Sequence, residues 1–136
     1  MDGAAAVRAE IADLSRGDLE AVLSYYTDDV YFEDVTVPEP CVNKEEMRAF
    51  MAAFYKGFPD LRIEIKHVVE QGAIVMAEYD LLGTHEGPFV GNEPTGRAFR
   101  IQAVSVYEHD GELFFRETVY YDSASMFGQL GIEPRA

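Results

Sequence analysis

The sequence contains one cysteine, no tryptophan and few basic residues. Because Cys41 has no second cysteine to pair with, an intrachain disulfide is excluded, and we expect a reducing, cytoplasmic location. No apolar run approaches the ~18 residues of a membrane span, and the N-terminal residues lack the pattern of a signal peptide. The 11 Lys and Arg residues against 25 Asp and Glu give a net charge of −14, which argues against nucleic acid and membrane surfaces as partners.

Motifs for several kinds of chemistry are also missing. The three histidines are widely scattered and Cys41 stands alone, so we expect no metal site. The Gly-rich segment 83–96 has neither phosphate-loop nor dinucleotide-binding spacing, and no Gly-x-Ser-x-Gly motif of a serine hydrolase occurs. The sequence therefore predicts a protein that works without a cofactor.

The chain that remains is ordinary in length and rich in apolar residues. Its 136 residues, 48 % of them hydrophobic, predict one globular domain over residues 1–136. Apolar residues at helical spacing predict helices over 7–14, 18–26 and 43–54, the last capped by Asn43. Alternating apolar residues and turn signals predict strands over 30–35, 61–70, 73–82, 98–109 and 112–121, followed by a short helix over 123–129.

Helices followed by consecutive strands predict an α+β fold. We expect a cone-shaped, curved antiparallel sheet with about three N-terminal helices packed on it, a short C-terminal helix and an enclosed apolar pocket. Both faces of strand 98–109 carry apolar residues, for example Ala103 and Val104. This pattern predicts a homodimer formed through the sheet.

Several short motifs carry a family resemblance. Gly-Thr-His-Glu-Gly at 83–87 and Pro-Thr-Gly-Arg at 94–97 resemble the SnoaL-like polyketide cyclase family, part of the nuclear transport factor 2-like superfamily that also includes ketosteroid isomerases. Further matching stretches lie, in the same order, at 17–19, 27–30, 58–61, 110–111, 121–122 and 129–131. The resemblance covers essentially the whole chain and implies a cone-shaped α+β barrel.

The resemblance also implies positions for catalytic groups. In cyclases of the family an acid/base Asp lies on the last long strand, where this chain has Val119, and a His lies on the preceding strand, at about Val104. Ketosteroid isomerases carry their base at the position of Asp34. Their oxyanion-hole Tyr corresponds to a position near Glu10, and their protonated Asp to Gln102 or Ala103.

Three residues are candidate proton-transfer groups. Asp34 shares a strand face with Val30 and Phe32, so it is expected to face the pocket as a general base, or else to bind loop amides at the strand end. Glu117 is expected inward on the family register, whereas the opposite parity would pair it with Arg100 or Arg116 on the open face. His85, where the Gly-rich loop begins, is a candidate acid or base, or a structural anchor of that loop.

The aromatic and aliphatic residues would line the pocket and bind a carbonyl compound. The expected substrate-binding residues are Tyr26, Phe32, Phe54, Phe89, Gln102, Val104, Val119 and Tyr121. The leading prediction is an enzyme for isomerisation, aldol-type cyclisation or dehydration of a small hydrophobic, polyketide-like carbonyl compound. The alternatives are a non-catalytic binding protein for a hydrophobic small molecule and a dimeric interaction module of the same fold.

Overall fold

The structure is a computed structural model that describes residues 1–133 of the chain. It contains four helices and five strands among these residues. In chain order they are α1 (Gly3–Ser15), α2 (Leu19–Leu23), β1 (Tyr26–Asp34), α3 (Lys44–Gly57), β2 (Arg62–Gln71), β3 (Ile74–Thr84), β4 (Ala98–His109), β5 (Phe114–Tyr121) and α4 (Ser123–Leu130).

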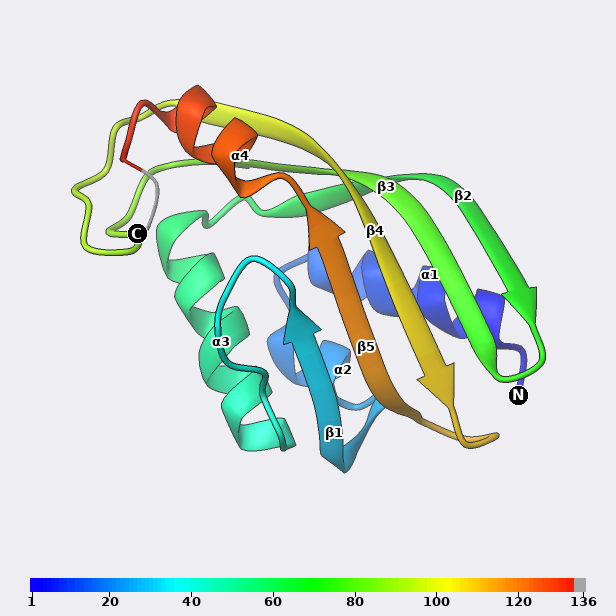
Figure 1. The fold of residues 1–136 in the computed structure, drawn as a ribbon. Coiled ribbons are helices and arrows are strands. Elements are labelled where there is room, and N and C mark those ends of the chain that lie inside the picture. The colour runs from blue at the N-terminus through cyan, green and yellow to red at the C-terminus, as the bar shows by residue number, and fades with distance from the viewer. Residues whose placement is uncertain (134–136) are drawn as a thin grey trace.

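The five strands form one strongly curved sheet in the order β1-β5-β4-β3-β2. Helices α1, α2 and α3 lie on its concave side, and α4 packs near the start of β4 (Figure 1). The predicted α+β class, the curved sheet and the short C-terminal helix are thus confirmed. One detail differs, because β1 runs parallel to β5 while the other pairs are antiparallel.

The segment 19–34 contains less helix and more strand than predicted. Helix α2 ends at Leu23, and β1 begins at Tyr26 rather than at residue 30. The Phe114 N–H donates to the Tyr25 carbonyl at 2.9 Å, and Tyr26 pairs with Phe114 across the sheet. Tertiary pairing therefore overrides the helical spacing of the apolar residues, as it commonly does for short elements.

Helix α3 lies where the sequence predicts it. Asn43 caps it by accepting from the Glu46 N–H at 2.8 Å, and Glu46 in turn accepts from the Val42 N–H at 2.9 Å. These two hydrogen bonds fix the start of the helix. The apolar side of α3 faces the sheet, and the rings of Phe50 and Phe32 lie 5.4 Å apart between their centroids.

A bulge in β5 sets the direction of the side chains beyond it. The β4–β5 register shifts after Glu108, so that Glu108 pairs with Arg116 and His109 with Phe114, leaving Phe115 out of the ladder. An extra residue in one strand reverses the in–out alternation on either side of it. Phe115 is consequently exposed while Glu117 is buried on the concave side.

The loop between β3 and β4 is held against the end of α3. The N–H groups of Glu86 and Gly87 both donate to the Gly57 carbonyl at 3.1 Å. A Cβ on Gly87 would lie 1.9 Å from the Lys56 carbonyl oxygen, so this close approach requires glycine. No helix within residues 1–133 is both long and apolar enough to cross a membrane.

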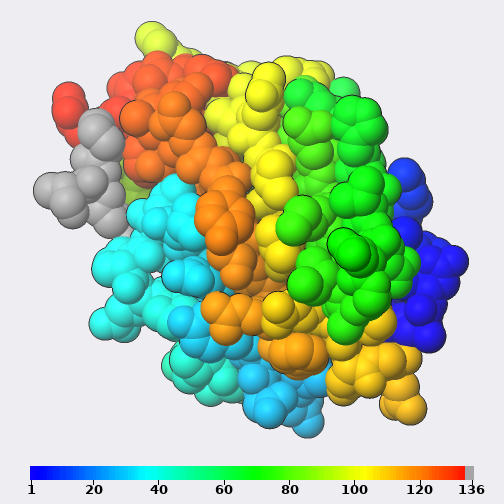
Figure 2. All heavy atoms as spheres, turned by 45° about the vertical axis from the view of Figure 1, so that its right-hand side comes forward, coloured from blue at the N-terminus to red at the C-terminus, as the bar shows by residue number. Residues whose placement is uncertain are grey.

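The convex face of the sheet carries side chains from β3, β4 and β5 side by side, with no helix over them in the view of Figure 2. Met76 pairs with Val106, and Val104 pairs with Tyr120 across neighbouring strands of this face. Met76 and Tyr120 are exposed. This group of four residues is called the outer apolar patch below.

Candidate functional site

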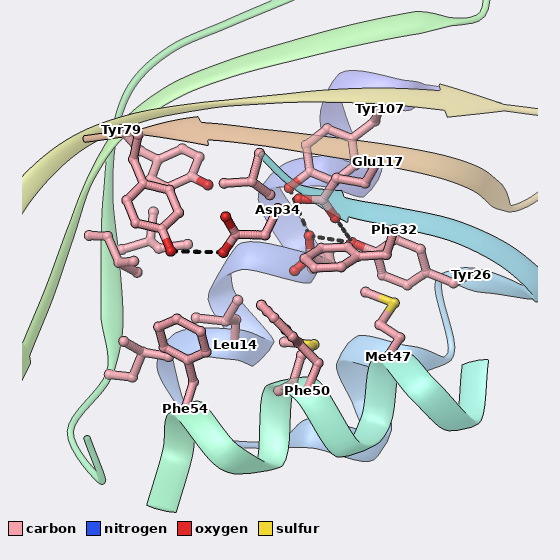
Figure 3. A pocket seen from close by; sticks show the side chains of 17 residues that line it. Leu14, Tyr26, Phe32, Asp34, Met47, Phe50, Phe54, Tyr79, Tyr107 and Glu117 are labelled. Atoms are coloured by element: carbon pink, nitrogen blue, oxygen red, sulfur yellow. Dashed lines mark hydrogen bonds between the residues drawn. The ribbon is translucent and has the colours of Figure 1, made fainter. Parts of the chain in front are cut away.

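The concave side of the sheet and α3 enclose two adjoining chambers. The inner chamber has about 90 Å³ of free space, and the outer chamber has about 410 Å³. Asp34, Phe50, Phe54 and Tyr121 line both of them, so these four residues form the neck between the chambers. Figure 3 shows Phe50 and Phe54 projecting from α3 toward Asp34.

The walls of the inner chamber are aromatic and aliphatic apart from three carboxyl groups and the tyrosine hydroxyls. The lining residues are Glu10, Leu14, Tyr26, Phe32, Asp34, Met47, Phe50, Met51, Phe54, Leu61, Ile63, Tyr79, Leu81, Tyr107, Glu117, Val119 and Tyr121. The outer chamber is completed by residues 36–39, by Phe89 and Val90 of the β3–β4 loop, and by α4. Within residues 1–133, no Lys, Arg or His side chain lines either chamber.

Asp34 is buried at the neck and its two carboxylate oxygens are both occupied. The Tyr121 hydroxyl donates to Oδ2 at 2.7 Å, and the Thr36 hydroxyl and N–H donate to Oδ1 at 2.7 and 2.9 Å. These three donors fix the orientation of the carboxylate. The two readings of Asp34 from sequence thus coexist, since it contacts a loop amide and also faces the pocket.

A second polar group lies at the closed end of the inner chamber. The Tyr26 hydroxyl lies 2.5 Å from Oε1 of Glu117 and 3.1 Å from Oε1 of Glu10 (Figure 3). The Tyr107 hydroxyl donates to the same Glu10 oxygen at 2.9 Å. All four side chains are buried, with exposed fractions of 5 % or less.

Burial changes the acidity of these groups. Removal from water raises the pKa of Glu10 to about 8, with a further contribution from the negative charge of Glu117. Burial likewise raises the pKa of Glu117 to about 7, against the lowering effect of hydrogen bonds from Tyr26 and Ser105. At neutral pH the closed end therefore retains protons that exposed glutamates would have lost.

Most of the predicted pocket residues do lie at the chambers. The inner chamber is lined by the predicted residues Tyr26, Phe32, Phe54, Val119 and Tyr121, together with Asp34 and Glu117. Phe89 lines the outer chamber instead. The inward parity of Glu117 follows from the bulge at Phe115. Arg100 pairs instead with Glu64 and Asp80, and Arg116 with Glu33.

Two predicted pocket residues lie on the other side of the sheet. Gln102 is exposed, and Val104 belongs to the outer apolar patch, so their expected position in the pocket is wrong. The side chains of β4 alternate, and the inward set is Ala103, Ser105 and Tyr107. Accordingly, Ser105 rather than Val104 is the residue that pairs with Val119.

His85 lies outside both chambers and fastens the β3–β4 loop. It is fully buried, and its Nδ1 accepts from the Thr95 N–H at 3.2 Å. Its backbone pairs with Arg97 and Gly96, and its ring contacts Phe58 at a centroid distance of 5.6 Å. The structure therefore supports the loop-anchor interpretation of His85 rather than a proton-transfer role.

Three polar pocket residues were missed from the sequence: Glu10, Tyr79 and Tyr107. Glu10 shares the buried face of α1 with Val7 and Leu14, and this spacing was available as a signal. The Tyr79 hydroxyl lies 2.7 Å from Oγ of Ser105 at the same closed end. Within the described part of the chain, no group of three or more His, Cys, Asp or Glu side chains could hold a metal ion.

Solved structures with this fold come from several bacteria. AclR, a proposed hydroxylase from Streptomyces galilaeus, superposes with a TM-score of 0.83 at 21 % identity over 93 % of each chain. IdmH, a proposed polyketide cyclase from Streptomyces antibioticus, gives a TM-score of 0.83 at 20 % identity over 97 % of this chain and 100 % of its own. A protein of ketosteroid isomerase-like fold from Catenulispora acidiphila, in complex with trimethylamine, gives 0.82 at 17 % identity over 95 % of this chain and 94 % of its own.

At these identities the structural matches show the shared fold alone. A search of curated protein sequences found no match. The sequence model of the SnoaL-like polyketide cyclases, however, matches residues 4–130, which is nearly the whole chain. The chain therefore belongs to the SnoaL-like polyketide cyclase family.

Proposed function

We propose that the protein is a cofactor-independent acid/base enzyme that removes a proton next to a carbonyl group of a hydrophobic, polyketide-like compound. The observation that carries this proposal is the position of Asp34 at the neck between the two chambers, with its oxygens oriented by Thr36 and Tyr121. A carboxylate held beside apolar walls suits a general base for a weakly acidic C–H bond.

The neighbouring strand supports the same role. Asp34 pairs with Val119, the position at which the family resemblance implies an acid/base aspartate. The carboxylate is thus supplied by β1 instead of β5, at the same level of the sheet. Glu117 lies one step deeper, paired with Phe32, and its carboxylic acid form is suited to donate a hydrogen bond to the carbonyl oxygen.

The walls limit the class of ligand. The outer chamber, with about 410 Å³, is large enough for a small organic molecule, and the inner chamber accepts only one small group. The carboxyl groups of Glu10, Asp34 and Glu117 have no basic residue beside them in the described lining, which disfavours an anionic ligand. A neutral ketone, or one carrying an amine, is favoured; the trimethylamine bound to the neighbour of ketosteroid isomerase-like fold agrees with this preference.

The test is proton exchange and double-bond migration in a simple probe. We expect 3-cyclohexenone to isomerise to the conjugated enone, and its α-hydrogens to exchange with deuterium in D₂O. The Asp34→Asn variant keeps the shape of the residue and should lose on the order of 10²–10⁴-fold in rate. Glu112→Gln, on the exposed β4–β5 turn, is the control.

The competing interpretation is a protein that binds a hydrophobic molecule without chemistry. Two results together would favour it. Cyclic ketones would change the NMR chemical shifts of the neck residues, which shows binding, and the α-hydrogens of the ketone would exchange equally slowly with wild type and with Asp34→Asn.

We also propose a homodimer in which the outer apolar patch of one copy packs on that of the second. The support is the outer apolar patch itself, in which Met76 and Tyr120 are exposed beside Val104 and Val106. Isolated exposed apolar residues are common, but an adjoining group on one sheet face is typical of an interface.

A further inference from the structure

The polar group at the closed end of the inner chamber is a continuous chain of hydrogen-bonding side chains. Glu10 of α1, Tyr26 of β1 and Glu117 of β5 follow one another through the Tyr26 hydroxyl. Tyr107 extends the chain beyond Glu10. The four elements that supply these groups, α1, β1, β4 and β5, come from both ends of the sequence, so the array exists only in the folded protein.

The number of hydrogens in this array is informative. The Tyr26 hydroxyl has one hydrogen but lies within bonding distance of two carboxyl oxygens, at 2.5 Å and 3.1 Å. If both carboxyl groups were ionised, one of these contacts would lack a hydrogen and place two like charges around one oxygen. Both contacts are satisfied when Glu10 is protonated and donates to the Tyr26 oxygen while the Tyr26 hydroxyl donates to Glu117, whose second oxygen can then carry a proton toward the ligand.

The described side chains around this array include no cation that would stabilise ionised forms of Glu10 and Glu117. From α1, the nearest further charge is Asp13, which adds to the negative field at Glu10. From β3 and β4, the facing groups are the hydroxyls of Tyr79, Ser105 and Tyr107, and from α3 the facing side chains are those of Met47 and Met51. No Lys, Arg or His of residues 1–133 lines this chamber.

We propose that Glu10 is a proton-relay residue, which shares a proton with Glu117 through the Tyr26 hydroxyl and resupplies Glu117 after that carboxylic acid has protonated the ligand. This inference rests on the proposed function for its ligand, a carbonyl compound in the inner chamber. Glu10 acts through Tyr26 and is not itself assigned a contact with the reacting atoms.

The transfer balances as a series of proton movements. Glu10 and Glu117 both start in the carboxylic acid form. The O–H bond of Glu117 breaks as a bond to hydrogen forms on the ligand oxygen. The Tyr26 O–H bond then breaks as its proton moves to the Glu117 carboxylate, and the Glu10 O–H bond breaks as its proton moves to the Tyr26 oxygen. The ligand is then an enol, which returns to a ketone by taking a proton from water at carbon and releasing its O–H proton to water. One proton from water restores Glu10, matched by the one that Asp34 releases.

The decisive experiment uses the ligand-free protein with ¹³C-labelled glutamate side chains. A pH titration by NMR should show the carboxyl carbons of Glu10 and Glu117 each following two shared steps, well above the range of the other glutamates. In the Tyr26→Phe variant the bridge is lost, and each carbon should follow a single step. Near-UV circular dichroism reports whether each variant retains its packing.

Two results would overturn the relay. One is a Glu10 carbon that titrates with the exposed glutamates, and the other is a pair of independent single steps in the wild type. Glu10→Gln, which preserves shape, provides a second route: Glu117 should then show one step alone. Glu112→Gln on the exposed turn should change neither titration.

The relay and the proposed function can be refuted by different results. With 3-cyclohexenone as the probe, Asp34→Asn tests proton removal, whereas Glu10→Gln tests proton resupply. We expect Glu10→Gln to retain α-hydrogen exchange but to lower kcat about tenfold. The wild-type rate should decline in two steps as the pH rises, because Glu10 and Glu117 ionise in turn, whereas the rate of Glu10→Gln should decline in one step. An unchanged pH profile in this variant would contradict the relay even if Asp34 proves to be the base.

Discussion

The Tyr121 hydroxyl donates to Oδ2 of Asp34 at 2.7 Å and thereby links the last residue of β5 to the last residue of β1. Tyr121→Phe removes this donor without removing the ring. We expect the reaction of 3-cyclohexenone to slow about tenfold, since a hydrogen bond to a charged group contributes ~1.5 kcal/mol or more. Steady-state rates should show the loss in kcat more than in KM.

The matched comparison is Thr36→Val, which removes the other hydroxyl donor to Asp34 and leaves the Thr36 N–H contact intact. A similar loss is expected here. Both variants at wild-type rates would mean that the orientation of Asp34 does not matter for the reaction, and the proposed base would need another residue.

The buried glutamates should make stability depend on pH in a particular direction. Their folded-state pKa values, about 8 for Glu10 and about 7 for Glu117, lie above the ordinary 4.5. Their contribution is therefore fully present below pH 4.5 and is lost as the pH rises through 7 to 8, because the unfolded chain ionises first. Each unit of pKa shift corresponds to about 1.4 kcal/mol.

Urea denaturation of wild type and of the double variant Glu10→Gln/Glu117→Gln at pH 5, 7 and 9 checks this dependence. Groups elsewhere in the chain cancel in the difference between the two proteins. The free energy of unfolding of the wild type, relative to the variant, should fall with rising pH; a difference that stays constant would show that neither glutamate is perturbed.

The β3–β4 loop offers a test of close packing. In Gly87→Ala the new Cβ would meet the Lys56 carbonyl oxygen, so the loop must move away from α3. We expect a loss of about 2 kcal/mol in the free energy of unfolding, measured by urea denaturation. Gly128→Ala in α4 is the control, because nothing lies within 4 Å of its added methyl group, and a gain of about 0.5 kcal/mol is expected.

The proposed dimer predicts a change in mass after a single surface substitution. Tyr120→Lys places a charge in the outer apolar patch, and light scattering after gel filtration should then report a monomer where the wild type is a dimer. Val42→Lys is the comparison: Val42 is exposed in the segment before α3 and does not belong to the patch, so the dimer should persist. A monomeric wild type would exclude this interface.

The sequence predicted the site most reliably where alternation along a strand is uninterrupted. Asp34 follows Val30 and Phe32 on one face, and the structure keeps all three inside. For β4, the positions inferred from the family resemblance were Gln102 and Val104, whereas the residues that face inward are their neighbours Ala103 and Ser105. Because side chains alternate between the two faces of a strand, an error of one residue in the alignment assigns every side chain to the wrong face.

Other features depended on contacts that no local pattern contains. The bulge at Phe115 determines the direction of Glu117, yet it arises from pairing with β4. Glu10 has the spacing of a buried helix residue, but a glutamate is not expected in a core. Its burial is explained only by the hydroxyls of Tyr26 and Tyr107, which the fold places beside it. The parallel pairing of β1 with β5 is likewise a long-range contact.

That parallel pairing has a consequence for the order of events during synthesis. Asp34 and its cross-strand neighbour Val119 are separated by most of the chain, and Glu117 reaches Tyr26 only when β5 docks beside β1. Contacts so distant in sequence form late and slowly. A ribosome-bound chain that ends before β5 would leave β1, which carries Asp34, without the strand it pairs with, so the proposed site is assembled only when the final strand docks.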